Sequence, residues 1–439
     1  MESTFEFLRF VQSKDLSFWD VKRLSFSLSN LSKTYSSVKL GDILTPIKNK
    51  IKKNEYNGQL PIISKISFND GKIHLRDDFK TGMDLYSLSL NDLLISNINF
   101  HQGATAINKI GDVVCSTHYQ PYSIDFFKVI PEYLILVLRN KIFLEYVSQQ
   151  KTNGIKTESN YNFIKNLEIP LPSMEKQKEL VAQYNALLNL AKDKENQAEQ
   201  MEQSIDDYLI AELGIKDNLI STNKNLFQTV EYKNLSKWVL DASYSISSKY
   251  KIFSFDEVCS KITDGTHQTP EYVSQGITFL SAKDVTSQEL SLKNVKYIPE
   301  YLHNQLKARC LPQKDDILLA KNGTTGVAAL FTLDYEVSIY VSLALLRCNL
   351  QLILPKFLLY YINSKFAKEQ FDKGLIGVGV PNLHLSVIKN TLIPLPPLDV
   401  QNQIVEEITL RKEQIKNLRE ESEKLRLQAI SNFEKEVFN

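Results

Sequence analysis

Four short stretches of this sequence concentrate side chains that can bind a polyanion or the edges of nucleic-acid bases. Lysines cluster in "IKNKIKKNEYNG", where ammonium groups can neutralise phosphates. Asparagine and glutamine gather in "SNINFHQG", where their amides can pair with adenine. "TDGTHQT" and "AKNGTT" add hydroxyl, imidazole, amide and ammonium groups. The candidate nucleic-acid contacts are Lys48, Lys50, Lys52, Lys53, Asn97, Asn99, His101, Gln102, Thr263, Thr266, His267, Gln268, Lys321, Asn322 and Thr324.

Each stretch also has a simpler interpretation. The lysines can form a solvated loop, and the asparagines can form a polar turn closed by their own side-chain hydrogen bonds. Gly265 and Gly323 are typical of tight turns. A lone His267 favours a structural hydrogen bond over base reading. The residue types alone leave these alternatives open.

The sequence lacks the usual signatures of catalysis. The only Pro-Pro, in "PLPPL" at Pro394 to Leu398, has neither flank of the loop with which an amino-methyltransferase holds its base. "KNGTTG" is not followed by the Gly-Lys-Ser/Thr of a phosphate-binding loop. The histidines have no metal-ligand spacing, and the four cysteines form no CxxC pair. We therefore predict a chain with no catalytic residue, no metal and no cofactor of its own.

Charge is distributed unevenly along a nearly neutral chain. Net charge is +1, but residues 38–80 carry nine Lys/Arg against five Asp/Glu, and residues 174–213 carry four against nine. This split fits one surface for a polyanion and another for a protein, or it is ordinary patchiness. No run of 18 apolar residues is present, and "MESTFEFLRF" does not resemble a signal peptide. We expect a reduced, cytoplasmic protein.

The elements that position these stretches occur twice. "IPLP" at Ile169–Pro172 returns at Ile393–Pro396, 224 residues later, and Gln177 matches Gln401 at the same offset. The only two tryptophans, Trp19 and Trp238, match at an offset of 219. The chain is therefore a tandem duplication with halves near 1–218 and 219–439. The framework repeats while the segments between diverge, which suits a module that does one job on two targets.

A long amphipathic helix follows each "IPLP". The apolar positions alternate steps of four and three, as in a coiled-coil seam. The predicted seam residues are Leu180, Tyr184, Leu187, Ala191, Ala198, Met201, Ile205, Ile404, Ile408, Ile415, Leu418, Leu425 and Ala429. Lys194, Arg411, Ser422 and Asn432 interrupt the pattern. Neither helix tolerates an insertion relative to the other, so we interpret their length as a spacer of about 60 Å and expect the two helices to pair antiparallel.

These features together resemble the specificity subunits of type I restriction–modification systems. The resemblance is carried by "IPLPSMEKQKELV" and "IPLPPLDVQNQIV", with "ITDGTHQTPEY", "GITFLSAKDV" and "DDILLAKNGTTG" in the second half. The first half departs from it, with "ILTPIKNKIKKNEYNGQLPIISKISF" in place of the TDGTH-type stretch.

The resemblance implies an α/β fold. It predicts two tandem target-recognition domains joined by two long helices in an antiparallel coiled coil, with pseudo-twofold symmetry. The expected parts are an N-terminal segment at 1–35, recognition domains at 36–172 and 251–396, long helices at 173–214 and 397–439, and a linker at 215–250.

The resemblance also implies a non-catalytic DNA-recognition subunit. Each domain would read half of an asymmetric bipartite site in the major groove of double-stranded DNA, and the coiled coil would set the half-site spacing. Two adenine methyltransferase (modification) subunits would dock on it, using S-adenosylmethionine. Restriction subunits that use ATP and Mg²⁺ would join through them. The alternatives are a modification-only or type II-like system, a self-contained DNA-modifying enzyme, and a coiled-coil adaptor with no DNA role.

Overall fold

The structure is a computed structural model that describes residues 32–150, 160–215, 247–374 and 382–439. The predicted N-terminal segment up to residue 31, most of the predicted linker, Trp19 and Trp238 lie outside the described residues. The chain divides into two compact units, the first made of Met1–Lys194 with Glu420–Asn439 and the second of Glu195–Arg419. Among the described residues, no helix is both long enough and apolar enough to cross a lipid bilayer.

In its described residues, the first unit builds its sheets from eleven short strands. They are β1 (Ser37–Lys39), β2 (Leu44–Pro46), β3 (Lys50–Ile51), β4 (Ile62–Ile66), β5 (Ile73–Leu75), β6 (Leu85–Leu88), β7 (Leu93–Ser96), β8 (Thr105–Ile107), β9 (Val113–Ser116), β10 (Tyr119–Ile124) and β11 (Glu168–Pro170). The helices are α2 (Pro131–Arg139), α3 (Lys141–Gln150) and α4 (Tyr161–Ile164), with 3-10 turns at Leu40–Asp42 and Phe100–Gln102. The sheets have the strand orders β2-β10-β7-β8, β3-β6-β9-β4-β5 and β1-β11.

The second unit repeats two of these sheets and three strands of the third. Its strands are β12 (Ile252–Ser254), β13 (Cys259–Asp264), β14 (Ile277–Leu280), β15 (Lys296–Ile298), β16 (Ile317–Ala320), β17 (Ala328–Leu330), β18 (Ser338–Ile339), β19 (Leu343–Cys348) and β20 (Leu392–Pro394). Its helices are α6 (Phe255–Val258), α7 (Glu300–Leu306), α8 (Pro355–Asn363), α9 (Lys365–Lys373) and α10 (Leu385–Asn390), with a 3-10 turn at Ala282–Asp284. The order β13-β19-β16-β17 matches β2-β10-β7-β8, and β12-β20 matches β1-β11. The strands β15-β14-β18 match β5-β4-β9 of the five-stranded sheet, because β14 is parallel to β18 and antiparallel to β15 as β4 is to β9 and β5.

The repeated tetrapeptide closes each unit. Ile169 pairs with Val38 in an antiparallel bridge, and Ile393 pairs with Phe253 in the same way. Both isoleucines are fully buried, and each strand ends at the following proline, which lacks the N–H that would continue a ladder. The tetrapeptide therefore ties the end of each module to its beginning before the long helix starts.

A buried glutamine fixes the start of each long helix. In the first unit the Gln177 amide oxygen accepts from Ile130 N at 2.9 Å, and its nitrogen donates to the carbonyls of Lys128 and Pro172. Gln401 makes the same three bonds to residues that lie 224 positions later. Its oxygen accepts from Leu354 N at 2.8 Å, and its nitrogen donates to the carbonyls of Leu352 and Pro396. A buried amide whose bonds are all satisfied rigidifies its surroundings. The repeat seen in the sequence is thus also a repeat of hydrogen bonds.

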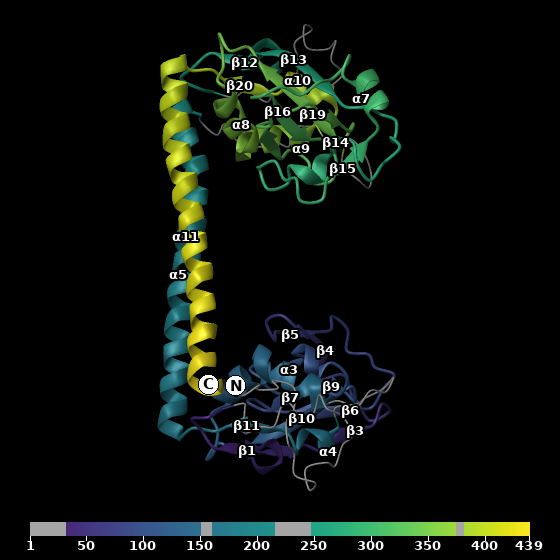
Figure 1. The fold of residues 1–439 in the computed structure, drawn as a ribbon, viewed down its shortest axis with the longest axis vertical. Coiled ribbons are helices and arrows are strands. Elements are labelled where there is room, and N and C mark those ends of the chain that lie inside the picture. Colours follow the sequence, from purple (N-terminus) through teal and green to yellow (C-terminus); the bar gives the residue numbers. More distant parts are fainter. Residues whose placement is uncertain (1–31, 151–159, 216–246, 375–381) are drawn as a thin grey trace, which may run out of the picture. The chain divides into compact units, whose positions relative to one another are not determined.

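The long helices α5 (Met174–Leu213) and α11 (Leu398–Phe438) contribute to both units and run side by side in each (Figure 1). In the first unit Ser422 Oγ donates to the Ala191 carbonyl at 2.8 Å, and Lys194 Nζ lies 2.7 Å from a Glu421 carboxylate oxygen. The partner number falls as the α5 number rises, so the helices are antiparallel.

The second unit pairs the same helices in the same sense. Arg419 lies 3.5 Å from Glu195, and Arg411 donates to Ser204 Oγ at 3.1 Å and lies over the Tyr208 ring. Three of the residues that interrupt the seam, Lys194, Arg411 and Ser422, therefore bond to the opposite helix. The thirteen predicted seam residues are all buried or half-buried. The predicted fold class, two tandem α/β modules with long helices in an antiparallel coiled coil, is confirmed.

Each core takes residues from the far end of one long helix. In the first unit Phe433, Val437 and Phe438 of α11 are buried in the core that α2 and α3 also build. In the second unit Leu209 and Leu213 of α5 are buried in the equivalent place. Burying one such side chain stabilises a core by about 1.5–3 kcal/mol. Neither module is complete without both helices.

Candidate nucleic-acid interfaces

The structure places predicted contacts of both units at the same edge of the repeated four-stranded sheet, where β7 and β16 end, whereas Lys50 lies on β3 of the five-stranded sheet. In the first unit the Asn97 backbone N–H, just after β7, donates to the His118 carbonyl at 2.9 Å. In the second, the Lys321 N–H, just after β16, donates to the Ser342 carbonyl at 2.8 Å. Both members of the second pair lie 224 residues after the first. The two candidate interfaces are therefore equivalent positions in the duplicated fold.

In the first unit, the lysine stretch begins at this edge. Ile47 N donates to the Pro121 carbonyl at 2.9 Å, and Gln120 Nε2 donates to the Ile47 carbonyl at 3.0 Å. Lys48 follows and is exposed, as are Lys52 and Lys53 further along. The Lys50 ammonium is bonded to Asp84 at 3.0 Å. Three of the four lysines thus present their side chains to solvent without an ion pair in the described part of the chain.

The asparagine loop of the first unit is partly a structural turn. Ser96 Oγ accepts from Asn99 N at 3.1 Å, and the Asn97 amide nitrogen donates to the Thr117 carbonyl at 3.0 Å. Asn97 therefore uses its side chain to hold the loop. Asn99 and His101 are half-buried, and Gln102 is exposed. Within this loop, Gln102 has the most accessible amide for contact with a base.

In the second unit, the TDGTH stretch is pressed against the β18–β19 connection. Thr266 N donates to the Ile339 carbonyl at 3.1 Å, and Val341 N donates to the Thr266 carbonyl at 2.9 Å. A Cβ on Gly265 would collide with the Ile339 carbonyl oxygen, so only glycine fits there. His267, Gln268 and Thr324 are exposed, while Thr263, Thr266 and Asn322 are half-buried. The loop is thus fixed in place and turns His267 and Gln268 outward.

An ion cluster joins the two predicted stretches of the second unit. Asp264, at the end of β13, is buried and bonds to Lys321 Nζ at 2.7 Å and to an Arg309 guanidinium nitrogen at 2.7 Å. His267 Nε2 lies 3.4 Å from the same carboxylate. Burial alone raises the pKa of Asp264, but the bond and charge of Lys321, with His267, bring it below its usual value. The Lys321 ammonium is buried against this carboxylate and does not face solvent.

Sequence reasoning missed Arg309 and Asp264. Arg309 is 45 residues from Asp264 in the chain and lies in an unremarkable segment after α7. Only the folded β13 and β16 bring Asp264, Lys321 and Arg309 together. No local pattern signals such a cluster.

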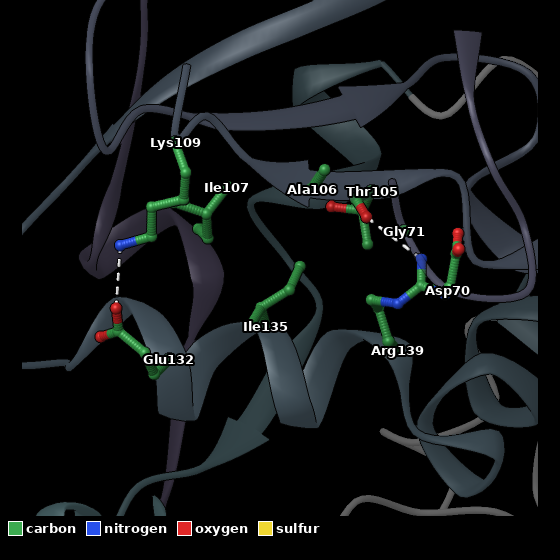
Figure 2. Close-up of a pocket in the computed structure, with 9 residues that line it drawn as sticks. All are labelled: Asp70, Gly71, Thr105, Ala106, Ile107, Lys109, Glu132, Ile135 and Arg139. Atoms are coloured by element: carbon green, nitrogen blue, oxygen red, sulfur yellow. Dashed lines mark hydrogen bonds and ion pairs between the residues drawn. The ribbon is translucent and has the colours of Figure 1, made fainter. Parts of the chain in front are cut away.

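A hollow in the first unit lies between α2 and β8 (Figure 2). Lys109 in this hollow is bonded to Glu132 at 2.8 Å. Arg139 donates to the Thr105 carbonyl at 3.2 Å and to the Phe68 carbonyl at 2.9 Å. Both cations are thus engaged by the protein itself. The hollow lies where α2, β8 and the 68–71 turn pack together. Because its two cations already bond to protein groups, it does not favour a ligand site.

The described residues offer little for thiol or metal chemistry. Burial raises the pKa of the Cys115 thiol to about 12 and that of Cys310 to about 11, and a protonated, buried thiol is a poor nucleophile. Within residues 32–150, 160–215, 247–374 and 382–439, no group of three or more His, Cys, Asp or Glu side chains could hold a metal ion.

Comparison with known proteins accounts for this duplicated architecture. A family model described as "Type I restriction modification DNA specificity domain" matches residues 32–200 and again residues 247–426. The chain belongs to this family. The two matches cover one repeat each, and the resemblance predicted from the doubled "IPLP" motif is confirmed.

Individual relatives agree with the family. The chain is 25% identical over 399 residues to the type I restriction enzyme MjaVIII specificity subunit of Methanocaldococcus jannaschii, covering 88% of each chain. It is 24% identical over 243 residues to the EcoBI specificity subunit of Escherichia coli, covering 55% of this chain and 50% of that one. A solved structure described as the "structural basis underlying complex assembly and conformational transition of the type I R-M system" matches with a TM-score of 0.57 at 17% identity, covering 92% of this chain and 97% of that chain. This last likeness supports the fold.

Membership in a family of DNA specificity domains assigns the chain to DNA target recognition within type I restriction–modification. Specificity subunits of this kind are not themselves catalysts. The equivalent sheet edges described above are the natural places to look for the DNA contacts.

Proposed function

We propose that each unit reads one half of an asymmetric bipartite site in the major groove of double-stranded DNA. The observation that carries this proposal is the pair of equivalent sheet edges, which share one backbone bond and differ in side chains. One edge presents Lys48 and Gln102, and the other presents His267 and Gln268. Base contacts specify a sequence, so different side chains at one place in a common framework imply two different half-sites.

The reading function is tested by mapping N6-methyladenine across a genome with and without this chain, with its modification subunit expressed in both cases. The expected result is one bipartite motif that is methylated only when the chain is present. Exchanging residues 36–172 for those of another specificity subunit should change only one half of the motif. An unchanged methylation map would refute DNA reading by this chain.

We further propose that α5 and α11 act as a ruler between the half-sites. The helices contain 40 and 41 residues, so each is about 60 Å long at 1.5 Å per residue. The polar seam residues Arg411 and Ser422 bond to the opposite helix, and polar residues in a seam specify its register. A rigid spacer of defined register suits two readers that must meet the same face of B-DNA.

The ruler is tested by inserting one heptad into both helices, after Lys194 in α5 and after Arg419 in α11. Seven residues lengthen a helix by about 10.5 Å, or roughly three base pairs at ~3.4 Å each. The methylated motif should keep both half-sites and gain about three base pairs of spacer. Inserting four residues into α5 alone, between Ala191 and Ala198, should instead misalign the seam and disturb assembly. Recognition of the original spacing by the paired-heptad variant would contradict the ruler.

The same duplication supports two docking sites for one kind of partner. The loop before α2 exposes Phe126 and Phe127, the latter 95% exposed, and the equivalent loop before α8 exposes Leu350. Each loop is held at its base by Gln177 or Gln401. Phe126 adjoins Phe127, and Leu350 lies two residues from the exposed Leu352, so each loop exposes two apolar side chains close together. Contiguous exposed apolar groups mark protein interfaces, whereas scattered single ones do not. We propose that each loop receives one modification subunit, with restriction subunits joining through them.

Docking is tested by the stoichiometry of the purified complex. Phe127→Asp and Leu350→Asp should each reduce two bound modification subunits to one, and the double variant should bind none. Phe79→Asp, at an exposed phenylalanine elsewhere in the first unit, is the control. S-adenosylmethionine would be bound by the modification subunit, and ATP and Mg²⁺ by the restriction subunit, so this chain alone should bind none of them in calorimetry.

A further inference from the structure

The Asp264 cluster orders its charges from buried to exposed. The Asp264 and Lys321 side chains are 3% and 7% exposed, whereas that of Arg309 is 58% exposed. Lys261 Nζ donates to the Arg309 backbone carbonyl at 2.8 Å and so adds a further cation beside it. A buried carboxylate thus holds an exposed guanidinium at a fixed point on the surface.

The cluster carries an excess of positive charge. Lys261, Arg309 and Lys321 contribute three positive charges and Asp264 one negative charge, which leaves +2 with His267 neutral. Lys321 is the most buried cation and already neutralises Asp264. The charge of Arg309 is therefore oriented by Asp264 without being cancelled by it.

In the first unit a lysine takes the chain position that Asp264 holds in the second, so the positive charge near this position comes from a different residue. Ile262 pairs with Leu346 on β19, and Pro46 pairs with Tyr122 on β10, where Leu346 lies 224 residues after Tyr122. Two residues beyond each of these strand positions come Asp264 and Lys48. Where the second unit has Asp264 with Arg309, the first has the exposed Lys48.

We propose that Arg309, oriented by Asp264, contacts a phosphate of the DNA backbone in the second recognition unit, and that Asp264 is its positioning residue. This rests on the proposed function of DNA reading. Phosphate contacts carry no sequence information directly, so two modules with different half-sites still need a cation at the same place. Shared charge on different residues is the pattern expected of a backbone contact. A residue that reads a base should differ between the modules in the kind of side chain it carries, because the two half-sites differ.

The test measures DNA affinity against salt concentration for the assembled complex with its modification subunits, on one duplex containing the methylated motif and one without it. Arg309→Ala should weaken binding to both duplexes by a similar factor and reduce the slope of log K against log salt by roughly 0.9. Arg309→Lys should keep the slope. Lys314→Ala, an exposed lysine just before β16 and so at the opposite end of that strand from Lys321, is the control and should change neither quantity.

Asp264→Asn separates positioning from simple electrostatics. This change raises the charge of the cluster from +2 to +3, so long-range attraction alone would tighten binding. Loss of orientation should instead weaken binding and lower the salt slope. Tighter binding by this variant would overturn the positioning role. If Asp264→Asn does not fold, the Arg309 variants still decide the contact.

The remaining outcomes separate the inference from the proposed function. An unchanged salt slope in Arg309→Ala would overturn the phosphate contact, and so would a changed base preference at one motif position, which would make Arg309 a base reader. A wild-type complex that does not distinguish the two duplexes would instead contradict the proposed function itself.

Discussion

Truncating Phe433 should destabilise the first unit although this residue comes near the end of the sequence. Phe433 is 4% exposed, and the centroid of its ring lies 6.0 Å from the ring centroids of Tyr133 and Tyr184. Phenylalanine-to-alanine changes in cores cost about 3–5 kcal/mol. For a unit of this size, each kcal/mol lowers Tm by about 2–4 °C. Phe433→Ala should therefore lower the melting temperature of the first unit by roughly 6–20 °C.

Hydrogen exchange followed by mass spectrometry tests where that stability is lost. Amide protection should fall in α2 and β11 of the first unit and be preserved in β13, β16 and β19 of the second. Ile430→Ala is the matched control, since Ile430 is on the same helix but 41% exposed, and surface changes usually cost within about 0.5 kcal/mol. Equal loss of protection in both units, or loss only in the second, would refute the assignment of the end of α11 to the first core.

Three further changes probe the framework. Gln177→Leu should cost about 3 kcal/mol or more in urea unfolding, because three backbone groups lose their partner, while Gln183→Leu, exposed on the same helix, should cost little. Ser422→Ala should cost about 1 kcal/mol in the same assay by removing the bond to Ala191; no change would contradict a register role. Because the pKa of Asp264 is lowered in the fold, its stabilising effect is present above its unfolded pKa and is lost as pH falls through the lowered value. Asp264→Asn should therefore flatten the acid side of a stability–pH curve, and a parallel curve would count against this linkage.

The framework was largely predictable because it repeats. The shared "IPLP" and the matched Gln177 and Gln401 locate each module's end. The four-three spacing predicts the long helices, and a twofold relation between the duplicated halves predicts their antiparallel pairing. Asn432, one of the residues that interrupt the seam pattern, is exposed, whereas the neighbouring Phe433 is buried in the first core. At its end the helix packs on the globular module as well as on α5, whose Lys176 lies 3.6 Å from Glu436. The spacing of a two-helix seam alone therefore no longer applies there.

The candidate sites were less predictable, because contact between distant residues decides them. The types of Asn97 and Lys321 suggested DNA contacts, yet the structure bonds Asn97 to Thr117 and buries Lys321 against Asp264. Arg309 carried no local signal and became a candidate only through its distance to Asp264. Residue types show what chemistry is available, whereas burial decides which groups can use it.

The sharing of α11 between the two units has a consequence for synthesis. The last strand of the first module, β11, ends at Pro170, but the core of the module includes Phe433, Val437 and Phe438, which are translated some 260 residues later. At about 5–20 residues per second, the ribosome needs on the order of 10–50 s to supply them. During that time the apolar groups around Tyr133 and Tyr184 lack their final cover. The nascent chain therefore passes through a period in which its first half is exposed to aggregation and to chaperones, and this period ends only when the last helix emerges.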